Sequence, residues 1–251
     1  MIALTRSVPE SFASALCAAA PNEVIDVDRA RRQHAAYREA LAACGAEVVE
    51  LPVADALADS CFVEDTAVVA AGVALITHPG APSRRAETAA TAEALATRYE
   101  LMHMTELATL DGGDCMRVGR TIFVGRSART NAAGIARLVE VFEPRGIRVV
   151  AIDMPNVLHL KCVCAPLGDD RITLADGTIP RAAFGDIDVV AIPAAESYAA
   201  NVLAIGDRVL AADGFPRSHD ALTRAGFDVT PLATTEFRKA DGALTCLSIL
   251  C

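Results

Sequence analysis

The sequence predicts an α/β fold built from about five similar units that close on themselves. Apolar runs typical of strands occur in pairs around a glycine, and each pair indicates a hairpin. The turn glycines stand at positions 72, 119, 168 and 206, at intervals of 47, 49 and 38 residues, which indicates a degenerate repeat of about 50 residues. A chain of 251 residues has room for about five such units, and closure would remove exposed sheet edges.

The expected elements follow one another in the same order along the chain. The paired apolar runs cover residues 67–76, 115–124, 162–174 and 202–211. Helix-like stretches follow at 83–98, 130–144 and 217–225, and further apolar strands at 148–152 and 228–232. No linker or block of charge divides the chain, so we expect residues 1–251 to form a single domain. An ordinary α/β sandwich with similar hairpins stays open, because periodicity alone does not exclude it.

Charge and hydropathy disfavour several classes of protein. With 23 basic and 32 acidic residues the formal charge is −9, whereas a nucleic-acid-binding protein needs a basic face. No stretch approaches the roughly 18 to 20 continuous apolar residues that span a membrane. The opening sequence MIALTRSVPESF lacks the basic and apolar regions of a secretory signal. We therefore expect a cytoplasmic protein without a nucleic-acid or membrane partner.

The 8 cysteines, in a chain without a secretory signal, favour reduced thiols that mostly pack in the core. Cys246 follows a polar Asp-Gly turn and precedes a short apolar strand, which makes it a plausible nucleophile, although a buried core thiol is the commoner outcome. Cys162 and Cys164 would share one face of a strand, but a second pair with zinc-ligand spacing is missing. The terminal Cys251 is expected to fray.

Histidine is scarce, with 5 residues in the chain. His159 comes just before an apolar strand and beside Lys161, where it could serve a Cys/His enzyme or be a hydrogen-bonded structural residue. His34 lies in the polar stretch RARRQHAAYREA, so we expect it to be solvated.

Acidic residues cluster in DSCFVEDTAVV and LDGGDC. Asp59, Glu64 and Asp65 bracket the apolar Phe62, and burying acids there is costly unless a cationic or donor-rich partner pairs with them. The motif that begins at Asp111 opens a hairpin, where its residues could simply shape the loop.

Two arginines, Arg84 and Arg129, stand at loop-to-helix transitions. Each could be solvated, or could grip a carboxylate through two parallel hydrogen bonds. The acids could bind a cation, the arginines could bind an anion, and a thiol with a histidine could carry out chemistry. Together these residues indicate that the ligand is an amino acid with a guanidinium side chain.

Seven motifs in order resemble one known family. They are SVPES (7–11), DSCFVEDTAVV (59–69), ALITHPGAPSRR (74–85), LDGGD (110–114), IFVGRSARTNAAG (122–134), LHLK (158–161) and DGALTCLS (241–248). The chain resembles the dimethylarginine dimethylaminohydrolases, members of the guanidino-group-modifying (pentein) superfamily with a five-bladed β/α-propeller fold. This likeness implies hydrolysis of Nω-methylated arginines to citrulline and an amine, through a covalent S-alkylthiouronium on a cysteine, with no cofactor.

The resemblance also implies a role for each site residue. Cys246 would be the nucleophile, His159 the general acid and base, and Asp111 the group that orients the histidine or helps to hold the reacting group. The substrate guanidinium would be bound by Asp59 and Asp65, with Glu64 and Phe62 nearby, the α-carboxylate by Arg84 and Arg129, and the α-amine by the backbone carbonyls of Val8 and Ala240.

Several alternatives remain at this point. Arginine deiminase or amidinotransferase chemistry would use the same kind of cysteine, and a non-catalytic arginine-binding protein could keep the acids and arginines alone. No metal is required by the implied mechanism, but Cys246 and His159 could bind an inhibitory zinc ion. A monomer or a homodimer is expected, and residues 8–22 could form a lid.

Overall fold

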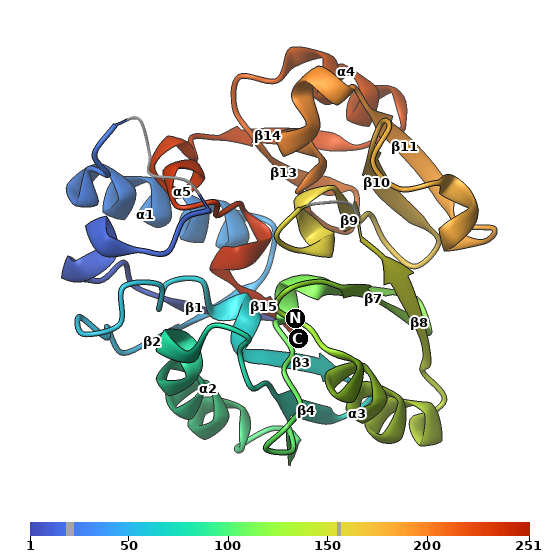
Figure 1. Ribbon diagram of the computed structural model, residues 1–251. Helices are drawn as coiled ribbons and strands as arrows, with labels where there is room; N and C mark the ends of the chain where they lie inside the picture. Colours follow the sequence, from blue (N-terminus) through green and yellow to red (C-terminus); the bar gives the residue numbers. More distant parts are fainter. Residues whose placement is uncertain (19–22, 155–156) are drawn as a thin grey trace.

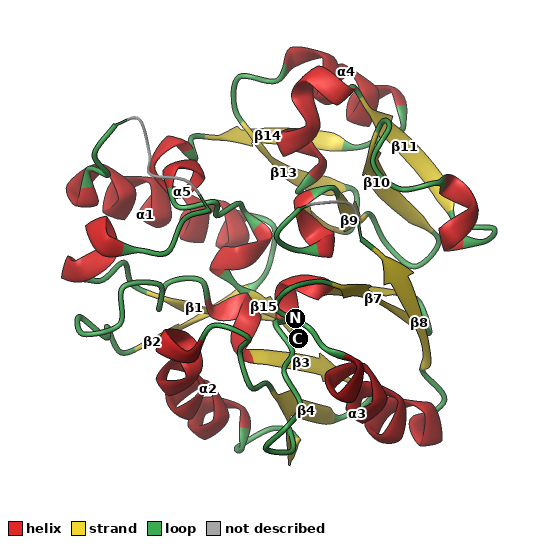
Figure 2. Ribbon diagram, viewed as in Figure 1, coloured by secondary structure: helices red, strands yellow, loops and turns green. Residues whose placement is uncertain are grey.

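Within residues 1–18, 23–154 and 157–251, which the computed structural model describes, the strands form five three-stranded sheets. The sheets surround a common centre, and the longer helices lie on the outside (Figures 1 and 2). In every sheet the middle strand pairs antiparallel with an inner strand and parallel with an outer strand. The predicted five-bladed β/α-propeller is therefore confirmed, and the sandwich alternative is wrong.

Four sheets follow the chain in order, each as a hairpin and a crossover to an outer strand. The first joins β3 (Ala67–Ala70), β4 (Val73–Ile76) and β5 (Glu100–His103) through α2 (Thr88–Leu95). The second joins β6 (Cys115–Val118), β7 (Thr121–Arg126) and β8 (Arg148–Asp153) through α3 (Ala132–Phe142). The third joins β9 (Cys164–Pro166), β10 (Arg171–Ala175) and β11 (Asp188–Ile192) through a 3-10 turn, Arg181–Phe184. The fourth joins β12 (Leu203–Ile205), β13 (Arg208–Ala212) and β14 (Asp228–Leu232) through α4 (Pro216–Arg224).

The two ends of the chain build the fifth sheet together. Its strands are β15 (Ile249–Leu250), β1 (Ile2–Arg6) and β2 (Glu47–Leu51), with α1 (Val27–Ala43) as the crossover and α5 (Thr235–Lys239) packed against α1. Both ends lie side by side near the centre (Figure 1). The N–H of Ile2 donates to the carbonyl of Cys251 at 2.6 Å, and the N–H of Cys251 donates back at 2.9 Å. The expectation that Cys251 frays is therefore wrong.

Three of the predicted hairpins have two-residue turns, and the β9–β10 hairpin has a four-residue loop, residues 167–170. At the β3–β4 turn, Ala71 and Gly72 both have positive φ, at 49° and 77°. Two successive positive φ values match the twist of the flanking strands, and glycine adopts them at little cost. Because glycine is favoured in such turns, the positions of the four glycines predicted the four hairpins.

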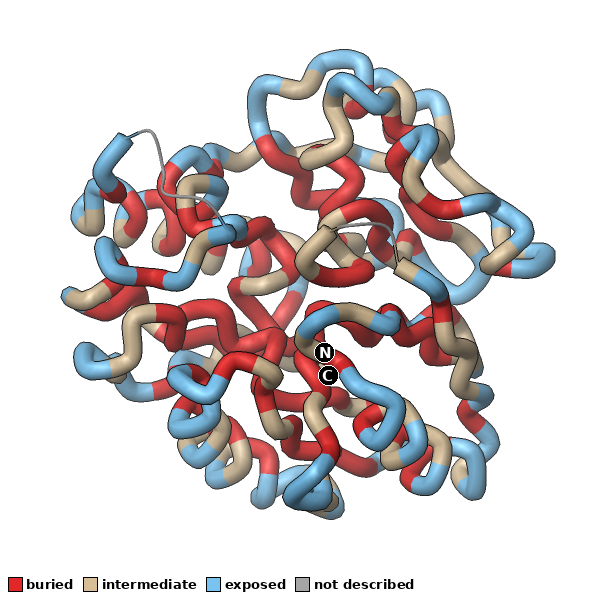
Figure 3. Tube along the Cα trace, in the orientation of Figure 1, coloured by how far each residue is buried: buried red, intermediate tan, exposed pale blue. Residues whose placement is uncertain are grey.

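The five inner strands enclose a central cavity of about 360 Å³, to which each of them contributes lining residues. Buried residues concentrate around this centre and beneath the outer helices, whereas the rim is exposed (Figure 3). None of the helices in the described ranges is long and apolar enough to cross a membrane.

Two expectations about single side chains are corrected by the packing. His34 is 2% exposed rather than solvated, and its ring lies 6.3 Å from the ring of Phe237, which closes over α1 from a distant part of the chain. Burial lowers the pKa of His34 to about 4. Cys162 and Cys164 do not share a strand, because Cys162 ends a 3-10 turn and Cys164 begins β9.

Candidate active site

A short 3-10 turn precedes every inner strand, and four of the five turns line one end of the central cavity. Contacts between neighbouring turns follow the order of the sheets, so polar side chains from distant parts of the chain meet here. The turns are Val63–Thr66, Gly112–Asp114, Leu160–Cys162, Ala194–Ala200 and Thr245–Leu247.

A second, smaller cavity of about 30 Å³ lies beside these turns. Eight of the predicted site residues line it: Asp59, Phe62, Asp65, Arg84, Arg129, His159, Ala240 and Cys246. It is much smaller than the central cavity. One lining residue, Leu16, belongs to the expected lid and donates its N–H to Asp59 Oδ1 at 3.0 Å. Residues 19–22 of that segment lie outside the described ranges.

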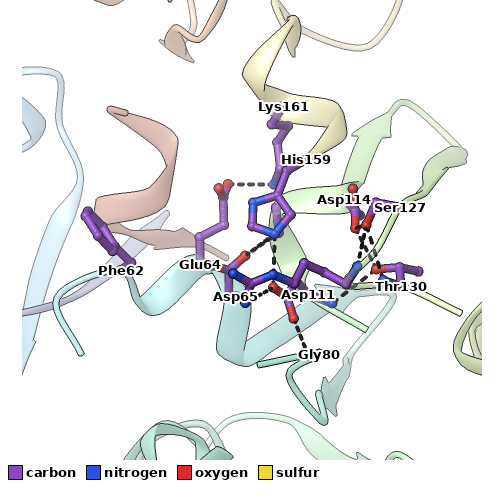
Figure 4. A network of polar contacts seen from close by, with 12 residues as sticks. Phe62, Glu64, Asp65, Gly80, Asp111, Asp114, Ser127, Thr130, His159 and Lys161 are labelled. Carbon is purple, nitrogen blue, oxygen red and sulfur yellow. Dashed lines mark hydrogen bonds and ion pairs between the residues drawn. The ribbon is translucent and has the colours of Figure 1, made fainter. Parts of the chain in front are cut away.

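His159 is held among carboxylates. Its Nε2 lies 3.0 Å from Asp111 Oδ2 and 4.0 Å from Asp65 Oδ1 (Figure 4). Asp111 is fully buried, and its other oxygen accepts the N–H of Gly80 at 2.8 Å. Burial alone would lower the pKa of His159, but Asp65, the hydrogen bond to Asp111 and the charge of Asp114 raise it to about 9. The imidazolium form is therefore the stable one at neutral pH.

Gly113 lets the histidine approach the backbone closely. A Cβ at this position would lie 2.7 Å from Nδ1 of His159 and 2.8 Å from Oδ1 of Asp65. The N–H of Gly113 also donates to Asp65 Oδ1 at 2.8 Å. Only glycine fits between these two side chains without displacing one of them.

Asp114 supports the histidine from a position that we did not predict as part of the site. It is fully buried and accepts the hydroxyls of Ser127 and Thr130 at 2.6 Å each (Figure 4). Its second oxygen accepts the N–H of Leu160, next to His159, at 3.0 Å. Its place in the Asp-Gly-Gly-Asp motif, directly before an inner strand, is the sequence signal that could have identified it.

The two arginines differ in how free their donors are. Arg84 is 5% exposed and is ion-paired with Asp65 and with Glu87, and it donates to the carbonyl of Phe62 at 2.9 Å. Arg129 is more accessible, and its Nη1 lies 4.0 Å from Asp111 Oδ2. Arg84 thus forms ion pairs with Asp65 and Glu87 as well as lining the cavity. Arg129 has more donors available to bind the carboxylate of a ligand.

Glu64 and Asp65 are neighbours in one turn but face different cavities. Glu64 lines the central cavity, where it accepts from Lys161 at 2.5 Å and from the hydroxyl of Thr245 at 2.8 Å, whereas Asp65 lines the small one. The turns therefore form a partition between the two cavities. Glu64 lies outside the lining that Cys246 shares with Asp65, so the structure gives no direct approach of Glu64 to a ligand beside the thiol.

Cys246 lies in the turn directly before β15, beside Thr245. Burial raises the pKa of its thiol well above the ordinary value, and the nearby charges of Glu64 and Asp65 raise it further. The thiol is therefore protonated in the free protein, and a cation bound nearby would favour the thiolate.

The remaining predicted contacts are backbone groups. Ala240 lines the small cavity, but Val8 does not, and its carbonyl accepts from Nε of Arg31 at 3.3 Å. Among the described residues, Asp65, Asp111 and His159 bring ligand atoms within 4.8 Å of one another, a spacing that a metal ion could use. Cys246 is not in that group, so an inhibitory zinc ion shared by Cys246 and His159 stays a prediction.

Comparisons with known proteins agree with this arrangement. The family model described as eukaryotic N,N dimethylarginine dimethylhydrolase matches residues 10–206. An N(G),N(G)-dimethylarginine dimethylaminohydrolase of Streptomyces coelicolor is 41% identical over 98% of this chain and 95% of its own length. One of the same name from Pseudomonas aeruginosa is 35% identical over 89% of each chain. A solved structure of the Pseudomonas aeruginosa enzyme, a Cys-to-Ser variant complexed with citrulline, superposes with a TM-score of 0.94 at 33% identity, covering 98% of this chain and 97% of that one. The chain belongs to the dimethylarginine dimethylaminohydrolase family.

Proposed function

We propose that this protein hydrolyses Nω,Nω-dimethyl-L-arginine or Nω-methyl-L-arginine to L-citrulline and dimethylamine or methylamine. The observation that carries the proposal is the meeting of Cys246, His159 and Asp65 around one buried cavity. Family membership supports the same reaction. We further propose that residues 1–251 act as one catalytic domain.

The carboxylates would hold the substrate cation. A guanidinium is resonance-stabilised and a poor electrophile, so the site must keep it and a thiolate together in attack geometry. Asp59 and Asp65 are the acids that line the cavity with the thiol, and the ring of Phe62 packs at its side. Glu64 would not contact the substrate. It would instead fix the position of Thr245, next to Cys246, by accepting the hydrogen bond of the Thr245 hydroxyl.

The other end of the substrate would be held by Arg129 and Arg84 at the α-carboxylate. The carbonyls of Val8 and Ala240 would receive the α-amine. Arg84 would keep its ion pairs with the buried acids and use a remaining donor. Val8 does not line the small cavity, so its carbonyl would reach the amine only after a local rearrangement.

Binding of the cation would prepare the nucleophile. In the free protein the acids disfavour the thiolate of Cys246, and a bound guanidinium cancels part of that negative charge. The Cys246 thiol gives its proton to solvent, and the thiolate attacks the guanidinium carbon, so a carbon–sulfur bond forms. His159, as imidazolium, protonates the departing amine as its carbon–nitrogen bond breaks.

Hydrolysis of the S-alkylthiouronium completes the cycle. Neutral His159 takes a proton from water, and the hydroxide adds to the same carbon. The carbon–sulfur bond then breaks and the added hydroxyl gives its proton to the sulfur, which releases citrulline and restores the Cys246 thiol. No cofactor takes part in these steps.

The test is citrulline release from three substrates: Nω,Nω-dimethylarginine, Nω-methylarginine and arginine. We expect turnover of the methylated substrates and little of arginine. Preferential turnover of arginine would overturn the specificity and favour a deiminase, and transfer to an added amine would favour an amidinotransferase. If no citrulline is released from any of the three substrates, the hydrolase function is wrong and a non-catalytic arginine-binding protein is favoured.

A Cys246→Ser variant tests the covalent step. It should fold like the wild type and lose turnover, because a serine hydroxyl is a much weaker nucleophile at neutral pH. Cys44→Ser, at the end of α1 and outside both cavities, is the matched control and should keep full activity. An active Cys246→Ser variant would refute the covalent scheme.

Two further properties remain proposals. We propose a cytoplasmic protein that is a monomer or a homodimer, with free thiols at all cysteines. Light scattering on the purified protein measures its mass in solution, and a larger assembly would contradict the proposal.

A further inference from the structure

Asn201 occupies a place that the proposed mechanism leaves without a role. Two of the five turns, Val63–Thr66 and Thr245–Leu247, carry residues to which the mechanism gives a task, and His159 directly precedes a third. The turn before β12, Ala194–Ala200, carries none of them, and Asn201 follows it directly. The side chain is 2% exposed, so its amide must find partners inside the protein.

The amide of Asn201 links the turn that follows His159 to the turn that contains Cys246. Its Nδ2 donates to the carbonyl of Lys161 at 2.8 Å and to the hydroxyl of Thr245 at 2.9 Å. Its Oδ1 accepts the N–H of Thr245 at 3.0 Å. The side chain thus binds the residue beside the proposed nucleophile through both its backbone and its hydroxyl.

These contacts close into a ring of four residues. The hydroxyl of Thr245 donates to one oxygen of Glu64 at 2.8 Å, and the ammonium of Lys161 donates to the other at 2.5 Å. Asn201 joins Lys161 to Thr245 on the opposite side. Three inner strands, β3, β9 and β15, start within two residues of the ends of the turns that this ring connects.

We propose that Asn201 is a positioning residue, which sets where Cys246 stands relative to His159 by fixing Thr245 against Lys161. The inference rests on the proposed function for its kinetic consequences. Loss of the amide leaves the carbonyl of Lys161 and the N–H of Thr245 without partners, and the turns shift to find new ones. A shift of about 1 Å at a reacting group can cost on the order of a hundredfold in rate.

Two disruptive variants and two controls test the proposal. Asn201→Asp keeps the shape but removes both donors, and Thr245→Val keeps the shape but removes the hydroxyl. Thr245→Ser keeps the hydroxyl and is the conservative rescue. Ser218→Ala is the matched control, because it also removes a buried hydroxyl that donates to a carboxylate, at 2.6 Å to Glu196, but at the start of α4 and outside both cavities.

We expect the two disruptive variants to lower kcat by about tenfold or more while KM changes by less than about threefold, since the groups that bind the substrate stay in place. Thr245→Ser and Ser218→Ala should stay within about twofold of the wild type. Wild-type kcat in Asn201→Asp would overturn the proposal. An equal loss in Ser218→Ala would also overturn it, because the effect would then be general destabilisation.

A second measurement does not depend on hydrolysis. 2-Chloroacetamidine is a small amidinium that alkylates thiols, and mass spectrometry of the peptide that contains Cys246 gives the rate at that residue. We expect Thr245→Val and Asn201→Asp to slow this alkylation by about tenfold. If the wild type releases no citrulline, the proposed function fails, whereas equal alkylation rates in wild type and Asn201→Asp would refute the role of Asn201 alone.

Discussion

The replacement of Asp111 by asparagine tests the electrostatics of the site directly. Asp111 Oδ2 lies 3.0 Å from Nε2 of His159, and Oδ1 accepts the N–H of Gly80. Asparagine keeps the shape and can still accept from Gly80, but it presents an NH2 donor to His159. A donor at this place favours the neutral imidazole, so the variant reverses the preference that the carboxylate creates.

The expected change in the pKa of His159 is large because His159 and Asp111 are both buried. The pKa of His159 is raised to about 9, with Asp65 and Asp111 both contributing. Removing one adjacent charge should lower it by about one to two units, which corresponds to about 1.4–2.7 kcal/mol of preference for the imidazolium. With a fall of about two units, the protonated share of His159 at pH 8 drops from about nine tenths to about one tenth.

The assay is the pH dependence of kcat/KM for dimethylarginine. In the proposed mechanism the imidazolium protonates the departing amine, so activity should decline as pH rises through the pKa of His159. The basic limb should therefore move to lower pH by about one to two units in Asp111→Asn. Asp111→Glu keeps a carboxylate and should retain most of the wild-type profile.

Two results would refute this reasoning. A basic limb that stays in place in Asp111→Asn would mean that His159 does not act as the acid, or that Asp111 does not set its pKa. A limb that moves equally far in Asp111→Glu would mean that the exact fit of the side chain matters, and not its charge.

Three further predictions concern the same site. Gly113→Ala should lower kcat by about a hundredfold in a folded protein, because the new methyl displaces His159; unchanged kcat with a wild-type circular dichroism spectrum would contradict this. Asp114→Asn should destabilise the protein by about 1–3 kcal/mol in urea unfolding, because the N–H of Leu160 loses a charged acceptor, and no measurable shift would contradict it. A zinc chelator should leave activity intact or raise it if zinc at Cys246 and His159 only inhibits, whereas loss of activity would indicate a required metal.

The sequence predicted most of the fold because its strongest signals are local. A glycine with positive φ between two apolar runs fixes a hairpin within about ten residues, and four of the five sheets begin in this way. The fifth sheet gave no such signal. Its inner strand, Ile249–Leu250, is very short and pairs with a strand at the opposite end of the chain, so no turn connects them.

The corrected residues depended on contacts between distant segments. His34 has polar sequence neighbours, which favour exposure, but Phe237 packs over it from about 200 residues away. Glu64 and Asp65 could not be separated by sequence, because the direction of each side chain depends on the turn that contains them. Asp65 meets His159, and Glu64 meets Lys161 on the other side of the partition.

The supporting residues were missed for a different reason. Asn201 belongs to no recognisable motif, and Asp114 was interpreted as a turn residue. Both share a feature that the repeat makes visible: they lie within two residues of the start of an inner strand, at Leu203 and Cys115. In a closed repeat, these positions converge on the central axis, so an unexplained polar residue there is a candidate for the site even without a motif.

The placement of charge also explains why the thiol can stay unreactive until the substrate arrives. Glu64 and Asp65 both oppose ionisation of Cys246, and burial opposes it further. His159 is already protonated, so it does not act as the base that activates the thiol in the free protein. A cationic ligand beside the sulfur adds further positive charge and so shifts this balance towards the thiolate. If Asp65 binds the guanidinium as proposed, the reactivity of Cys246 is coupled to occupancy of the cavity, and a neutral alkylating reagent should react there more slowly than an amidinium of similar size.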